Sequence, residues 1–194
     1  MWPTNSRAAL LSALLALPLC AGSILAQASN DSSKRFEKEG IIFDYAPNWQ
    51  VSDQRNGDVQ QVVLAEKALD AQIMITVLRS PVTSPEEVES AKHAIVEPTI
   101  AMVLKQASDA GIDVDRTPIE GEVAGLRAEG MRLSFAVDGF PGATEIYWLV
   151  MDNQMVNLIF IRPEKTASQA TVCWDLIRHT LGLMKVDTKN KNKK

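Results

Sequence analysis

The residues best able to do chemistry in this 194-residue chain lie at intervals of four: Glu89, His93 and Glu97. This spacing places all three side chains on one face of an expected helix. An imidazole and two carboxylates could present three ligands to a divalent metal ion. A closed metal site usually draws on a second element, so a solvated helix face is the preferred interpretation. The sequence therefore predicts no cofactor and no metal.

Three further carboxylates, on Asp109, Asp113 and Asp115, follow the same expected helix. A calcium loop requires more oxygen ligands in a fixed order, so an ordinary polar loop is expected. The chain has one other histidine, His179, and contains no Gly-x-Ser-x-Gly, Cys-x-x-Cys, Walker or His-Glu-x-x-His motif. An enzyme, whether a hydrolase or a metal enzyme, is thus the least favoured of three hypotheses.

Cys173 lies in TVCWDLIRHTL, a segment whose apolar residues recur at helical spacing. Free cysteine is among the most buried residue types, so a buried thiol is the preferred interpretation. A reactive thiol would need exposure and a basic neighbour. His179 comes six residues later and faces another side of the helix.

Two aromatic residues, Tyr45 and Trp49, flank Pro47 in the stretch GIIFDYAPNWQVSD, residues 40–53. Such residues beside a turn could form a surface for a partner or ligand, but each also serves as a core anchor with one polar end. We prefer a structural corner that fixes the first hairpin against the core. The partner or ligand surface stays as the alternative.

The N-terminal residues 1–28 have the features of a signal peptide. Arg7 precedes an uninterrupted apolar stretch, and the small residues Ala26 and Ala28 suit a signal peptidase, which predicts cleavage after Ala28 and a secreted or periplasmic protein. Two alternatives stay open. One is a lipoprotein modified on Cys20, and the other is an uncleaved anchor over residues 8–28, close to the ~20 residues that span a bilayer.

After a polar lead over residues 29–35, strands are expected at 41–45, 49–52, 60–66 and 71–79. A long helix follows over residues 84–111, with Ser84 as its N-cap, Pro85 at its first position and Gly111 at its end. Pro98 lies inside this helix, where it removes a backbone hydrogen bond. The helix should therefore be kinked or divided in two.

A three-strand antiparallel meander is expected over residues 131–137, 144–151 and 154–161. Its last two strands are almost entirely apolar, which indicates that both faces of the sheet are covered. A second helix, residues 166–183, can cover the second face, with Thr166 and Gln169 in capping-box spacing. The prediction is one α+β domain over residues 36–183, an α/β/α sandwich with an antiparallel sheet between helices.

This order of elements, with the Tyr-x-Pro-x-Trp turn at residues 45–49 and a closing helix after Ile-Arg-Pro, resembles the PsbP/Mog-like superfamily over residues 36–183. Members of that superfamily include an extrinsic subunit of the oxygen-evolving photosystem, a Ran-binding protein, secretion chaperones and bacterial envelope proteins. The resemblance implies a fold that binds other macromolecules, and it brings no shared catalytic motif.

Charge narrows the range of partners. The chain carries 24 acidic and 20 basic residues, and the tail over residues 184–194 is rich in lysine. An acidic body argues against nucleic acid. The tail could make a weak contact with an anionic membrane surface, at roughly 1 kcal/mol per lysine, although a solvated end is preferred.

Two binding functions precede the enzyme hypothesis. The first is a non-catalytic accessory module of the cell envelope that engages a protein partner. The second is a carrier or chaperone for an apolar ligand or lipid. The second hypothesis predicts a groove between the Pro98-kinked helix and the sheet, with Met102 and Leu104 in the ligand surface.

Overall fold

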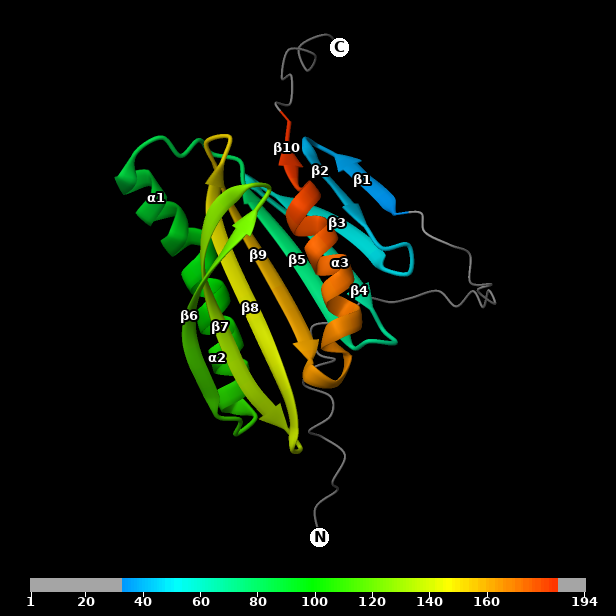
Figure 1. Cartoon of the computed structure of the whole chain (residues 1–194). Helices are drawn as coiled ribbons and strands as arrows, with labels where there is room; N and C mark the ends of the chain where they lie inside the picture. The colour runs from blue at the N-terminus through cyan, green and yellow to red at the C-terminus, as the bar shows by residue number, and fades with distance from the viewer. Residues whose placement is uncertain (1–32, 185–194) are drawn as a thin grey trace.

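The main sheet has seven antiparallel strands in the order β3-β4-β5-β9-β8-β7-β6 (Figure 1). The structure is a computed structural model that describes residues 33–184, so the predicted signal peptide and the lysines of the tail lie outside the described residues. The strands are β3 (Gln50–Asn56), β4 (Val59–Glu66), β5 (Ala71–Leu78), β6 (Val114–Val123), β7 (Leu126–Val137), β8 (Phe140–Met151) and β9 (Gln154–Pro163).

A second, smaller sheet has the order β1-β2-β10, formed by β1 (Lys34–Lys38), β2 (Ile41–Tyr45) and β10 (Gly182–Leu183). The predicted first hairpin, β2 with β3, is therefore wrong, because these strands belong to different sheets. The chain before β2 supplies its partner instead, and Phe36 stacks on Phe43 with ring centroids 4.9 Å apart. Strand β1 thus includes Lys34 and Arg35, which the sequence analysis assigned to the polar lead.

The long helix is divided as Pro98 predicts. It consists of α1 (Pro85–Ala91), a π-helical turn η2 (Lys92–Val96) and α2 (Glu97–Asp109). Ser84 caps α1, and its hydroxyl and the Glu87 carboxylate form a reciprocal capping box. Pro98 occupies the first turn of α2, where its missing N–H is tolerated.

Helix α3 (Ala167–Thr180) follows a short 3-10 turn, η3 (Glu164–Thr166), and covers the opposite face of the sheet from α2 (Figure 1). The predicted capping box at its start does not form. The Thr166 hydroxyl instead donates to the backbone oxygen of Leu69 at 2.7 Å. This bond ties the start of α3 to the turn between β4 and β5.

The meander has four strands, not the predicted three, because β6 extends it at the sheet edge. Pro118 lies within β6, and proline is tolerated on an edge strand since one side of that strand forms no ladder. The predicted fold class, an antiparallel sheet with helices on both faces, is confirmed. Within residues 33–184, no helix is both long and apolar enough to span a bilayer.

Candidate functional site

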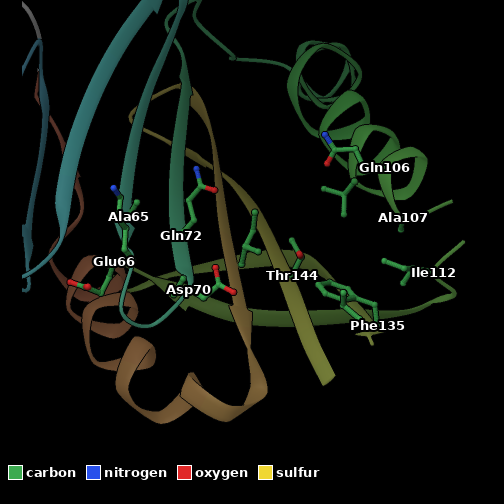
Figure 2. Close-up of a pocket in the computed structure, with 14 residues that line it drawn as sticks. Ala65, Glu66, Asp70, Gln72, Gln106, Ala107, Ile112, Phe135 and Thr144 are labelled. Carbon is green, nitrogen blue, oxygen red and sulfur yellow. The ribbon is translucent and has the colours of Figure 1, made fainter. Parts of the chain in front are cut away.

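An open apolar groove lies between α2 and the sheet face that α3 does not cover (Figure 2). It encloses about 860 Å³ of space, including its open mouth. Its apolar lining comes from the helix, from the segment that follows the helix, and from strands β7 and β9: Val103, Ala107, Ile112, Phe135, Val137 and Ile161.

The groove exists because α2 fills only part of the face beneath it. None of the residues of α2 is fully buried. Ile100 and Leu104 pack against a cluster that contains Leu133 and Ile146 on the sheet. One turn further along, Ala107 lines the groove with only a methyl group.

The floor of the groove carries two polar side chains. Gln72 on β5 and Thr144 on β8 are both paired in register with Ile161 on β9, so they flank it on one face of the sheet. Their exposed fractions are 8% for Gln72 and 2% for Thr144. Figure 2 shows Gln106 on α2 across the groove from them.

The groove continues into a second hollow at the end of the sheet. Both are lined by Asp70, Phe135 and Val137. The second hollow adds Phe140, which is 67% exposed and follows the tight turn between β7 and β8. An apolar path therefore runs from the floor of the groove to an exposed aromatic ring.

Beside the apolar cluster under the π-helical turn, the same sheet face carries a hydrogen-bonded carboxylate. Glu129 accepts hydrogen bonds from Trp148 Nε1 at 3.0 Å and from Lys92 Nζ at 3.3 Å. The indole donor and then the ammonium group hold the pKa of Glu129 below its usual value. These groups already have partners and do not line the groove.

The predicted ligand residues Met102 and Leu104 do not line the groove. Met102 is 39% exposed, and Leu104 packs into the cluster beside the groove. The lining residues Val103, Gln106 and Ala107 belong to the same helix. Helical spacing from Ile100 would have found Val103 and Ala107, since positions three and seven residues further along share its face.

Tyr45 and Trp49 lie on the other side of the sheet from the groove, with the core that α3 covers. Trp49 is only 3% exposed, and its backbone N–H donates to the oxygen of Ala46 at 3.2 Å. Tyr45 is half-buried and meets Phe43 edge to face at 6.0 Å. This arrangement is that of a structural corner.

The carboxylates and histidine singled out in the sequence do not converge. His93 Nδ1 lies 2.7 Å from Glu97 Oε2, whereas Glu89 pairs with Lys92. Asp109, Asp113 and Asp115 are exposed, and Asp109 pairs with Lys105. Among residues 33–184, no group of three His, Cys, Asp or Glu side chains is arranged to hold a metal ion.

Cys173 lies on α3 and is fully buried. Its sulfur accepts a hydrogen bond from the backbone N–H of Ala46 at 3.5 Å. Burial raises the pKa of the Cys173 thiol to about 11. A thiol in this environment is protonated at neutral pH and is a poor nucleophile.

The architecture of this chain is similar to that of a solved structure. The solution structure of cyanobacterial PsbP (CyanoP) from Synechocystis sp. PCC 6803 matches with a TM-score of 0.51 and 13% sequence identity, over 87% of this chain and 99% of that chain. The chain has a PsbP-like fold. No family model and no curated protein matches the sequence.

Other solved structures resemble the PsbP-like fold of this chain more distantly. A protein from Bacteroides thetaiotaomicron VPI-5482 matches at 11% identity with a TM-score of 0.48, over 78% of this chain and 48% of that chain. LpqN, involved in cell envelope biogenesis of Mycobacterium tuberculosis, matches at 9% identity with a TM-score of 0.37, over 79% and 91% of the two chains. Sequence identities this low do not establish a function.

Proposed function

We propose that this protein is a non-catalytic binding module of the cell envelope, which holds an apolar ligand in the groove beneath α2. The observation that carries the proposal is the groove itself, a mostly apolar hollow that opens to solvent between α2 and the sheet. Ligand sites are concave, mostly apolar and carry a few polar groups. The groove has all three properties.

The loose packing of α2 supports the same function. A helix with no fully buried residue can shift outward with little loss of core contacts. The π-helical turn before it offers a place where such a shift could begin, since π-bulges are frequent at functional sites. The envelope location rests on the signal-peptide prediction, which concerns residues outside the described range.

The apolar-ligand hypothesis is now preferred to the protein-partner hypothesis, which the sequence had favoured. A groove between the kinked helix and the sheet is the feature that the carrier hypothesis expected. A protein partner remains the second candidate, and exposed Phe140 at the end of the groove is the observation that favours it. The mass of the protein isolated natively from its own cells separates them, because a lipid adds far less mass than a protein.

Filling the groove tests the proposal directly. Ala107→Trp places an indole in the groove, whereas Ala101→Trp places the same indole on the exposed side of α2. We expect the fluorescence of the uncharged apolar dye Nile red to rise on binding to the wild-type protein and to Ala101→Trp, and not to rise with Ala107→Trp. Equal dye binding by both variants would show that the dye binds outside the groove and would overturn the proposal.

A further inference from the structure

We infer that the ligand of this groove is a single-chain amphiphile whose head group is uncharged and forms hydrogen bonds, an inference that rests on the proposed function. The first observation is the pair of polar side chains in the floor. Gln72 and Thr144 are each more than nine-tenths buried and line the groove. Within residues 33–184, neither side chain has a hydrogen-bond partner.

Unlike Asn157 Oδ1, the polar atoms of Gln72 and Thr144 are not closed off from the groove, so water or a ligand head group there can supply their hydrogen-bond partners. Gln72 offers a donor and an acceptor, and Thr144 offers a hydroxyl that can do either. Their strands lie on the two sides of β9, so roughly 10 Å separates the two backbone positions. One head group with several oxygen atoms, such as a glycerol ester, can reach both.

The charges around the groove disfavour an anionic head, because two carboxylates and one lysine line its rim. Lys67 shares the β4–β5 rim with the carboxylates of Glu66 and Asp70, and the floor itself has no ionised group. In the adjoining hollow, Arg162 is held by Glu164 at 2.8 Å and Glu145 at 3.6 Å. Lys165 lines the same hollow, together with the carboxylates of Asp70 and Asp138. A carboxylate placed over Gln72 would lose its hydration and would lie near the rim carboxylates of Glu66 and Asp70, and an ammonium would lose its hydration with no ionised partner in the floor itself.

The backbone beneath the groove also excludes an extended peptide. Strands β5, β9 and β8 are paired with one another throughout the floor. A peptide lying there would bring a row of N–H and C=O groups and would find in the floor only the side chains of Gln72 and Thr144, with Gln106 opposite them. An acyl chain has no such groups to satisfy.

The hydrocarbon chain of the ligand follows the apolar side chains that line the groove. From the floor it runs past Ile112, Phe135 and Val137 toward Phe140 at the open end. A flexible hydrocarbon chain covers these side chains and removes them from water, which is the main favourable term for such a ligand. The head group of the ligand then lies over Gln72 and Thr144, and its hydrocarbon chain extends toward the turn between β7 and β8.

The test uses two probes with the same chain length and different heads, monolauroylglycerol and laurate, titrated calorimetrically into the purified protein at pH 8. We expect monolauroylglycerol to bind about tenfold more tightly than laurate. Gln72→Leu and Thr144→Val should each weaken binding of monolauroylglycerol by about tenfold and weaken binding of laurate less. Thr76→Val is the matched control, because Thr76 lies on the same strand and face as Gln72 but outside the groove.

The outcomes separate this inference from the proposed function. Equal affinity for the two probes, or no effect of Gln72→Leu and Thr144→Val, overturns the head-group inference. If Nile red still binds and Ala107→Trp still blocks it, the apolar groove retains its function. If neither monolauroylglycerol nor Nile red binds, both proposals fail. Thermal unfolding of each variant confirms that a loss of binding is not a loss of fold.

Discussion

Four residues of α3 are buried, Ala170, Cys173, Trp174 and Ile177, whereas α2, with 13 residues, has none. The two helices cover opposite faces of one sheet, so the strands between them are the same (Figure 1). What differs is how completely each helix fills the space above its face. The contrast separates the part of the molecule that stabilises the fold from the part that is free to bind.

The α3 face is closed by aromatic packing. Trp174 stacks on Phe160 with centroids 5.0 Å apart and lies 5.9 Å from Tyr147. The Arg178 guanidinium lies over the rings of both Tyr147 and Trp174, at 5.8 and 5.7 Å. The small sheet adds a further layer, and the backbone N–H of Asp44 donates to the Thr180 hydroxyl at 2.8 Å.

The α2 face is held mainly at one end. Val96 and Ile95 of the π-helical turn are buried with Met155, and Ile100 and Leu104 follow as half-buried contacts. Beyond Leu104 the helix no longer touches a filled core, and the groove begins. Stability is therefore concentrated on one face of the sheet and binding space on the other.

The largest expected effect comes from the closed face. Trp174→Ala removes a buried indole that contacts two other aromatic rings, and such truncations destabilise by about 3–5 kcal/mol. Val103→Ala on the groove side removes a half-buried side chain and should lower the free energy of unfolding by about 1 kcal/mol. Urea denaturation measures both. Similar losses for the two variants would contradict the comparison.

A pH effect of intermediate size should also arise on the α3 face. The folded-state pKa of Cys173 is about 11, above its reference value of 9.0. The folded protein favours the neutral, protonated thiol. The free energy of unfolding is therefore unaffected by the titration of this group below pH 9 and falls as pH rises from 9 toward 11. This loss amounts to about 2–3 kcal/mol.

The measurement is the free energy of unfolding at pH 8 and at pH 10.5, for wild-type protein and for Cys173→Ala. Lysine and tyrosine titrations affect both proteins alike, so the difference between their slopes belongs to the thiol. Cys173→Ala should be less stable at pH 8 and should lose less stability on alkalinisation. Parallel slopes would mean that the thiolate is accommodated and that this face is less closed than the packing indicates.

Much of the fold could be predicted from the sequence because its signals are local. Ser84, Pro85 and Pro98 act through backbone hydrogen bonds within one or two turns, and the apolar strands indicate two covered faces. The pairing of β2 with β1 and β10 could not be predicted in this way. Such pairing depends on contacts between residues far apart in sequence, including β10 at the end of the domain.

The site could be predicted only as a location. The position of Pro98 indicated that the helix over the sheet would be divided, but the groove lies further along the chain, from Val103 to Ile112, and not at the proline. Met102 and Leu104 were chosen for their residue types, but a groove is formed where side chains are small, and Ala107 gave no signal by itself. Gln72 and Thr144 are polar residues in apolar strands, and their significance depends on strand register.

The smallest expected effect concerns Asn157, a polar residue in the centre of the α2 face. Asn157 is fully buried on β9, and its Nδ2 donates weakly to the oxygen of Ile95 in the π-helical turn, at 3.5 Å. Its Oδ1 has no partner within the described residues 33–184. Asn157→Leu removes this unpaired oxygen and keeps a similar volume, so the free energy of unfolding should rise by about 1 kcal/mol.

Asn157→Ala is the control, since it removes the same amide but leaves a cavity and should not stabilise the protein. If Asn157→Leu is more stable than the wild-type protein, the buried amide of Asn157 lowers the stability of the α2 face. A residue that lowers stability is expected on a face that serves binding. If Asn157→Leu loses more than about 1 kcal/mol, the amide is fully satisfied in the folded protein. The polar residues beneath the π-helical turn would then be structural, and the contrast between the two faces would be confined to the groove around Gln72 and Thr144.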